Sequence, residues 1–326
     1  MFIDAASVGR NEPWRYAVGG LLLVLGFAIS SVFLIGAIVG WHYLLDPAAS
    51  FGDALLAFAM GMEFRWRWGD PYPNSQHFVF AVYLLSLLVA AIGPILAVKY
   101  LHKRPARTLV LAKGSFDWLL LWKSFVVVFI GYAAWVGAML ILAWDDTTIV
   151  EPFHDFLILT MIVVSFVPLQ VLGEEMIFRG YVLQATARFS RFSIVRILVP
   201  SALFFAVHLP GSEMTVGGIP FVLHYTIISL YLTWVTIRTD GLEAGIGLHI
   251  GNNFIAILFV TDEVRTISVP ALFFMQSSHF ELLPVMLVSV LIGHYWFVIR
   301  GKFPASQTRT PDDSSGNPSS SQRSSS

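Results

Sequence analysis

Two adjacent carboxylates, Glu174 and Glu175, stand in an apolar stretch of the sequence, with Arg179 close behind them. On a helix, Glu175 and Arg179 are four residues apart and share a face, so these two charges can neutralise each other. Glu174 is rotated by about 100° from Glu175 and is left without a local partner. An unpaired carboxylate in a semi-dry site suits a general base, which takes a proton from water near neutral pH. The alternative interpretation is a structural ion network at a helix end.

Two other apolar stretches also carry polar groups. His208 ends one of them, and His249 lies early in the other with Asn253 on the same face and Asn252 pointing elsewhere. Singly, each is also explained by structure, as a buried histidine with a partner or as hydrogen bonding between helices. Together, a base, two imidazoles and an amide supply the groups needed to activate water and to stabilise an oxyanion.

The composition shows which elements must position these groups. Of the 326 residues, 56% are hydrophobic and 13% are charged, about half the roughly 25% charged share of a soluble domain. The mean hydropathy is +0.72. These values exclude a water-soluble globular protein, and the lack of cysteine excludes disulfides, thiolate metal sites and a cysteine nucleophile. The net charge of -1 gives no support for nucleic-acid binding.

A membrane-spanning helix needs about 20 mostly apolar residues. Eight segments meet this need approximately: 17–45, 77–99, 117–143, 155–172, 192–209, 219–237, 243–260 and 282–299. The sequence therefore predicts an all-α fold, a polytopic membrane bundle of about eight transmembrane helices with a buried polar catalytic cavity. Charged groups in hydrocarbon cost several kcal/mol, so the polar residues within these segments are candidates for function.

The loops between the segments predict the topology of a multi-pass membrane protein. The loop 99–113 carries a basic cluster without an acid: Lys99, Lys103, Arg104, Arg107 and Lys113. The loop 144–155 is acidic. By the positive-inside rule the basic loop is cytoplasmic, and an eight-span count then places both termini in the cytoplasm. For a bacterial source, the membrane is the cell membrane.

Three regions are expected along the chain. Residues 1–150 form N-terminal transmembrane helices and loops, and residues 151–302 form the catalytic membrane core. Residues 303–326 are rich in Ser and Pro and have no large apolar side chain after Phe303, so we expect a disordered tail there.

Three motifs occur in this order: Glu174-Glu175 with Arg179, Phe204 with His208, and His249 with Asn253. In their residues, spacing and order, they resemble the CAAX-protease and bacteriocin-processing (CPBP) family. These proteins are intramembrane endopeptidases related to the CAAX prenyl protease type 2 and to Abi proteins. The resemblance covers about 170–260.

The resemblance implies hydrolysis of a peptide bond in a membrane cavity. In the family's mechanism, Glu174 activates water with help from His208, and His249 and Asn253 stabilise the oxyanion. Two other residues of the first motif hold the shape of the site, namely Glu175 and Arg179. The implied partners are the lipid bilayer and a membrane-embedded or lipid-anchored peptide substrate, with no nucleic acid.

Zinc is an alternative cofactor, held by His208, His249 and Glu174, since two imidazoles and a carboxylate can bind a catalytic zinc ion. The sequence lacks the compact His-Glu-x-x-His motif that usually supplies such ligands, so we favour catalysis without a metal. Of the other histidines, His224 lies within a span and is the main candidate for an added role. Two alternatives from other classes stay open: a catalytically silent scaffold or bacteriocin-immunity factor, and a proton-coupled transporter.

The three motifs must also meet at one depth in the membrane. An antiparallel pair of 174–189 and 192–208 brings Glu174 opposite His208, with 155–172 as a separate segment broken near Pro168 and Gly173. His249 then lies near the wrong end of its span. We therefore expect a bend or re-entrant segment, for which the glycines of the 209–220 loop give the backbone freedom.

Overall fold

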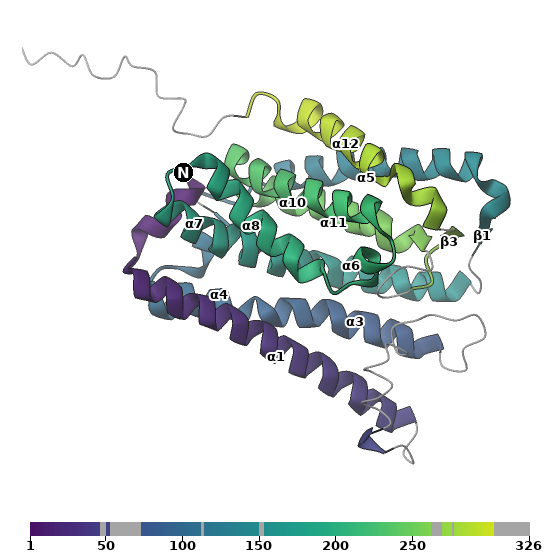
Figure 1. Ribbon diagram of the computed structural model, residues 1–326, viewed down its shortest axis with the longest axis horizontal. Helices are drawn as coiled ribbons and strands as arrows, with labels where there is room; N and C mark the ends of the chain where they lie inside the picture. The colour runs from purple at the N-terminus through teal and green to yellow at the C-terminus, as the bar shows by residue number, and fades with distance from the viewer. Residues whose placement is uncertain are drawn as a thin grey trace, which may run out of the picture.

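The computed structural model describes residues 1–45, 50–52, 73–111, 114–149, 153–261, 269–275 and 277–302. The tail 303–326 lies outside the described residues, and its expected disorder stays a prediction. The described chain is a bundle of long helices that run roughly side by side (Figure 1). The predicted all-α fold is confirmed.

The helices and turns of the N-terminal half are η1 (Phe2–Val8), α1 (Pro13–Leu45), α3 (Pro73–Ala90), α4 (Ile92–Leu96), η3 (Ala97–Leu101), η4 (Ala106–Leu109), α5 (Trp118–Leu142) and η5 (Trp144–Asp146). Those of the C-terminal half are α6 (Phe153–Glu175), η6 (Met176–Val182), α7 (Leu183–Phe189), α8 (Ser193–His208), α9 (Ser212–Thr215), α10 (Ile219–Thr239), α11 (Glu243–Leu258), η7 (Ser277–Leu282), α12 (Leu283–His294) and η8 (Tyr295–Ile299). Elements marked η are short 3-10 or π turns. A small sheet in the order β1-β3-β2 joins three short strands at one end of the bundle, β1 (Thr147–Ile149), β2 (Val260–Thr261) and β3 (Phe273–Met275).

Six apolar helices of the described chain are long enough to cross a membrane: Pro13–Trp41, His77–Leu101, Trp118–Leu142, Phe153–Phe189, Ile219–Thr239 and Phe280–Ile299. The other two predicted spans correspond to α8 and α11, which have 16 residues each. Many large apolar side chains point outward, among them Ile141, Leu142 and Phe297. Because a soluble protein would cover such a surface with polar groups, the bundle is that of a multi-pass membrane protein.

The expected break between 155–172 and 174–189 is wrong. Helix α6 passes through Pro168 and continues through the π turn η6 into α7, as one apolar span of 37 residues. Neighbouring helices make an internal proline tolerable in a membrane span. Gly173 provides close packing rather than a break, since a Cβ there would lie 3.2 Å from the Leu87 carbonyl oxygen of α3. The predicted pairing of 174–189 with 192–208 is confirmed by the contacts of α8 with η6 and α7.

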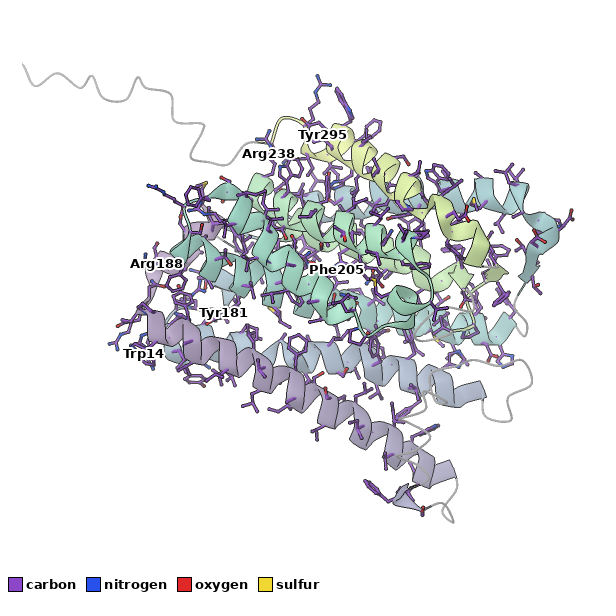
Figure 2. The ribbon with its side chains drawn as sticks, in the orientation of Figure 1. Trp14, Tyr181, Arg188, Phe205, Arg238 and Tyr295 are labelled. Carbon is purple, nitrogen blue, oxygen red and sulfur yellow. The ribbon has the colours of Figure 1, made fainter. Side chains whose placement is uncertain are left out.

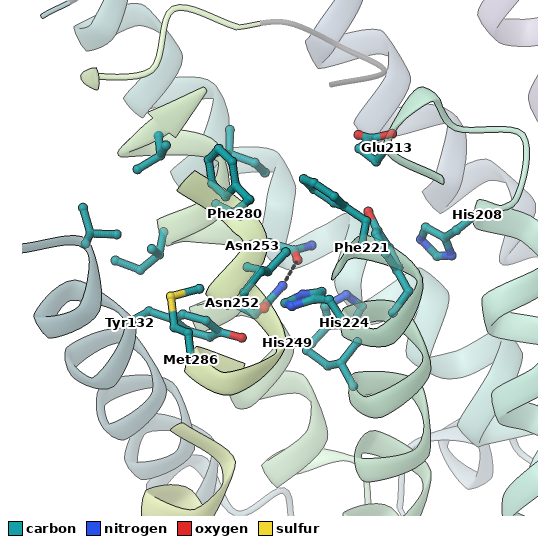
Figure 3. A pocket seen from close by; sticks show the side chains of 18 of the residues that line it. Tyr132, His208, Glu213, Phe221, His224, His249, Asn252, Asn253, Phe280 and Met286 are labelled. Atoms are coloured by element: carbon teal, nitrogen blue, oxygen red, sulfur yellow. Dashed lines mark hydrogen bonds between the residues drawn. The ribbon is translucent and has the colours of Figure 1, made fainter. Parts of the chain in front are cut away.

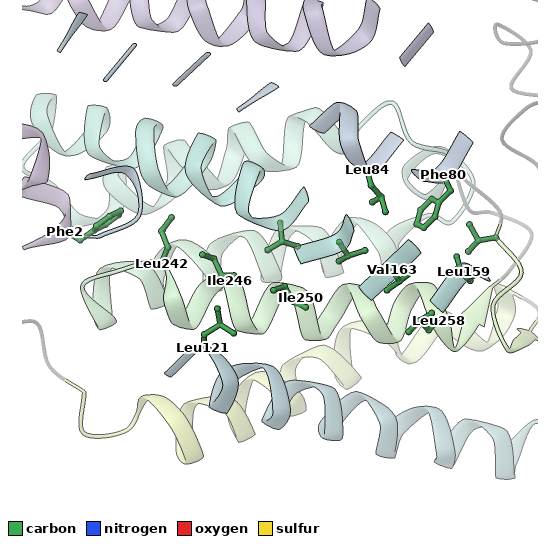
Figure 4. Close-up of a cluster of buried hydrophobic side chains, with 13 residues drawn as sticks. Phe2, Phe80, Leu84, Leu121, Leu159, Val163, Leu242, Ile246, Ile250 and Leu258 are labelled. Carbon is green, nitrogen blue, oxygen red and sulfur yellow. The ribbon is translucent and has the colours of Figure 1, made fainter. Parts of the chain in front are cut away.

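Helix α11 lies in the middle of the bundle, between α5 and α6 (Figure 4). Ile246 and Ile250 of α11, with Leu242 just before it, belong to a buried apolar cluster that also contains Leu121 of α5 and Val163 of α6. Close approach to α5 requires glycine, because a Cβ on Gly247 would collide with the Leu121 carbonyl oxygen. This central helix carries the third motif.

A bend or re-entrant segment at 209–220 was expected to bring His249 to the depth of the other motifs, but the structure shows a different cause. Residues 1–11 and 102–111 fold over the start of α11: the Leu242 amide donates to the Val110 carbonyl at 3.3 Å, and the Phe2 amide donates to the Asp240 carboxylate. Leu242 is fully buried as a result. Since α11 begins beneath this cover, His249 lies within the bundle, and a re-entrant 209–220 loop is not what brings it there.

The division of the chain at residue 150 stays a prediction. Helices from both sides of that position pack against each other, as α5 does along α11 and α3 along α6.

Candidate functional site

The first motif forms a buried ion pair at the junction of α6 and η6. Arg179 Nη1 lies 3.0 Å from Glu175 Oε1, and both side chains are fully buried. The guanidinium also donates to the Ser229 carbonyl at 3.2 Å and to the Thr233 hydroxyl at 3.4 Å, both on α10. The predicted pairing is confirmed. Added hydrogen bonds help to sustain such a pair inside an apolar bundle, although Glu175 Oε2 is itself buried without a hydrogen bond.

Phe204 of α8 is the side chain on which the motifs meet. Its ring lies 4.3 Å from the Arg179 guanidinium carbon. The same ring is 4.6 Å from the His208 ring and 5.8 Å from the His249 ring, measured between centroids. The ring is 2% exposed, so it fixes the spacing of the polar groups around it.

Glu174 differs from Glu175 as the sequence predicts. Its carboxylate lies at the wall of a cavity, and its Oε2 atom is buried without a hydrogen bond. The nearest charged partner is on another helix: His249 Nε2 lies 3.6 Å from this oxygen. Glu175 also has an oxygen without a hydrogen bond, but of the two carboxylates only that of Glu174 lines the cavity.

Two bonds orient His249. Its Nδ1 atom lies 2.9 Å from Glu175 Oε1, an oxygen that can only accept when ionised, so Nδ1 carries the proton. This bond turns Nε2 toward Glu174 and the cavity. Glu175 thus links Arg179 to His249 and holds the ring in place.

His208 ends α8 and lines the same cavity. Its Nδ1 atom lies 2.7 Å from the Phe204 carbonyl oxygen, which again assigns the proton to Nδ1. Nε2 of the neutral ring is then left as an acceptor. The ring of Tyr225 on α10 packs beside it, with centroids 4.7 Å apart.

Asn253 lies one helical turn after His249, and its amide is held from both sides. Its Nδ2 donates to Gln170 Oε1 at 3.3 Å, and its Oδ1 accepts from Asn252 Nδ2 at 3.0 Å. Gln170 was not singled out in the sequence, although a buried glutamine on an apolar helix, 4% exposed, is a signal of the same kind as the histidines. Asn252 was expected to point elsewhere but lines the cavity as well.

The cavity joins these groups (Figure 3). Its volume is about 250 Å³, and Glu174, His208, His249 and Asn253 all line it. The other walls are mostly apolar and come from α3, α5, α10 and α12, including Tyr83, Tyr132, Trp135, Met139, Phe221 and Met286. His224, the main candidate among the other histidines, also lines it. The structure therefore brings the predicted site residues to one polar wall of an apolar chamber.

The zinc alternative finds no assembled ligand set. In the part of the chain that the structure describes, no three His, Asp or Glu side chains are placed to share a metal ion. His208 and His249 each use one ring nitrogen in a bond to the protein. Zinc stays an untested prediction, and the metal content of the purified protein tests it.

Comparison with known proteins gives one family match and one relative. Residues 155–255 match the family described as "Type II CAAX prenyl endopeptidase Rce1-like". The chain is similar to "Uncharacterized protein YyaK" of Bacillus subtilis (strain 168), with 26% identity over 270 residues, which cover 81% of this chain and 84% of the relative. No solved structure matches. The matched segment begins in α6 and ends in α11, so it contains all three motifs, and over this segment the chain is similar to the Rce1-like CAAX endopeptidase family.

Proposed function

We propose that the protein is an intramembrane endopeptidase that hydrolyses a peptide bond of a membrane-embedded or lipid-anchored peptide. One observation carries the proposal: Glu174, His208, His249 and Asn253 line a single cavity inside an apolar bundle. Charged groups are costly there, and a chemical function explains why they are gathered at one wall. The match of 155–255 to an endopeptidase family supports the same reaction class.

Glu174 is the proposed general base. Its free oxygen accepts a proton from a water molecule, and the resulting hydroxide attacks the carbonyl carbon of the peptide bond. His208 supports this step, since Nε2 of its neutral ring can accept a hydrogen bond from the same water. The proton held by Glu174 then passes to the nitrogen of the leaving amine as the carbon–nitrogen bond breaks.

His249 and Asn253 are the proposed oxyanion donors. The Asn253 amide group offers an N–H, and His249 offers Nε2–H when both ring nitrogens carry protons. Glu175 supports this role, because its bond to Nδ1 fixes the ring and its negative charge stabilises the imidazolium. Donors that are already oriented stabilise the developing charge without further rearrangement.

The walls indicate the kind of substrate. Aromatic and methionine side chains surround the polar wall, and such a chamber suits an apolar peptide segment. Lipid-facing helices surround it, so a substrate anchored in the bilayer is already concentrated at the protein.

The direct experiment is cleavage by the purified protein in lipid vesicles. Membrane peptides are incubated with these vesicles, and new peptide termini are identified by mass spectrometry. The proposal expects termini that are absent from vesicles without the protein. A folded wild type that produces none would overturn it, and proton or solute flux through those vesicles would favour the transporter instead.

A further inference from the structure

The lysine and arginine side chains of the described chain gather at one end of the bundle. Among the described residues, every lysine and arginine except the buried Arg179 lies at or within two turns of one end: Arg10, Arg15, Lys99, Lys103, Arg104, Arg107, Lys123, Arg188, Arg191, Arg196, Arg238, Arg300 and Lys302. Figure 2 labels Arg188 and Arg238 on this side, where the N-terminus also lies (Figure 1). We call this side the basic end.

Contacts between distant parts of the chain establish that these residues share one end. The Arg10 amide donates to the His102 carbonyl at 2.7 Å, which joins the N-terminal segment to the loop after η3. The Arg104 guanidinium donates to Gln184 of α7 at 2.6 Å. Ile299 packs in one apolar cluster with Leu120, near the start of α5.

The opposite end carries acids. Among the described residues its charged side chains are Asp145, Asp146, Asp155, Glu213 and Glu281. We call this side the acidic end.

The cavity reaches the acidic end. Its lining includes Glu213, which follows α8, and Leu282, which precedes α12 and is 49% exposed. It also includes Val260 and Met275 of the small sheet that lies there. Toward the basic end, the chain beyond Glu174 is closed, because Glu175, Arg179 and Gln184 are fully buried.

From this arrangement we propose that the cavity receives its substrate from the extracytoplasmic side of the membrane. Lysine and arginine are retained on the cytoplasmic side, so the basic end faces the cytoplasm and the acidic end faces outward. The substrate is then a peptide exposed at the outer surface or already translocated across the membrane. That a substrate enters the cavity rests on the proposed endopeptidase function. That the cavity opens toward the outer side of the membrane does not depend on that function.

The chain has no cysteine, so single cysteines report accessibility without a background. Thr148→Cys places a thiol on β1 at the acidic end, and Ser193→Cys places one at the exposed start of α8 at the basic end. Leu282→Cys places one in the cavity mouth. Each variant is expressed in bacterial spheroplasts and treated with a membrane-impermeant maleimide, before and after the membrane is permeabilised.

We expect T148C and L282C to be labelled in intact spheroplasts and S193C only after permeabilisation. The opposite pattern, or labelling of L282C only after permeabilisation, would overturn the inference. A second readout concerns the substrate: labelling L282C from outside should slow the cleavage of membrane peptides, whereas the same treatment of S193C should not. Cleavage that survives complete labelling of L282C would contradict access through this mouth. A protein without peptidase activity would still give the labelling pattern, so failure of the proposed function is recognised separately.

Discussion

Gln170 offers a test of how the site residues are positioned. Its side-chain oxygen accepts from the Asn253 amide at 3.3 Å, so it holds the proposed oxyanion donor without facing the reacting atoms itself. Replacing Gln170 by Ala should lower kcat by about 10- to 100-fold with little change in KM, since small displacements of a reacting group have effects of this size. Steady-state kinetics on a cleaved peptide measure both constants.

The conservative variant Gln170→Glu keeps an acceptor at this position and should recover part of kcat. If Q170A and Q170E lowered kcat and KM alike, or if neither changed kcat, Gln170 would have no positioning role.

The residues of the candidate site, and which of them share a helix face, could largely be predicted from the sequence. The partners that other helices bring to them could not. Glu175 with Arg179, and His249 with Asn253, are spaced four residues apart, and helix geometry alone places each pair on one face. The bond from Asn253 to Gln170 joins residues 83 positions apart, and the bond from Glu175 to His249 joins residues 74 apart. Such contacts depend on how helices pack, which no local spacing encodes.

At the scale of elements, helices α5 and α11 pack closely enough that a single added methyl group tests their contact. A Cβ on Gly247 would collide with the Leu121 carbonyl oxygen, which belongs to the backbone and cannot rotate away. Gly247→Ala should therefore reduce the free energy of unfolding by about 1–3 kcal/mol, the usual cost of overpacking. Thermal unfolding in detergent provides the measurement.

Gly137 on α5 is the matched control, because a Cβ there meets nothing within 4 Å. Gly137→Ala should leave the melting temperature unchanged or raise it, since alanine favours the helix. Equal melting temperatures for G247A and the wild type would show that α11 can move away from α5 without cost.

The cover over the basic end should make stability depend on pH. His102 bonds to the Arg10 carbonyl through Nδ1 and to the Tyr181 hydroxyl through Nε2, and burial lowers the pKa of His102 below its usual value near 6.5. Below pH 6.5 the unfolded chain takes up a proton that the folded protein resists, so the free energy of unfolding falls as the pH drops. Above pH 6.5 this contribution is constant.

The test compares the melting temperatures of the wild type and His102→Asn between pH 8 and pH 5. This range lies within about 1.5 units of the usual histidine pKa. The variant should lose less stability than the wild type on acidification. Identical pH dependence in the two proteins would mean that His102 does not contribute.

The sequence predicted the apolar helices well and their continuity less well. Each of the eight segments corresponds to a helix, because length and hydropathy are local properties. The break expected near Pro168 and Gly173 was wrong, since packing of Gly173 against α3 keeps that region helical. The buried start of α11 could not be predicted either, because it depends on the terminal segment 1–11 reaching Asp240.

For the whole molecule, scarcity of charge is the organising property. Charged residues are 13% of the chain, and most of those described lie at the two ends of the bundle. The exceptions within it are Glu174, Glu175 and Arg179, and only Glu174 keeps an unpaired oxygen at the cavity. The proposed function therefore depends on this one carboxylate more than on any other group.

The most direct test is the rate of peptide cleavage by Glu174→Gln, a variant that keeps the shape of the side chain and removes the base. Glu281→Gln makes the same chemical change at an exposed position of the acidic end and is the control. With melting temperatures that show both variants to be folded, kcat/KM of E174Q should fall by about 10²- to 10⁴-fold, the usual contribution of a general base. The control should match the wild type. Wild-type cleavage by folded E174Q would contradict the proposed mechanism.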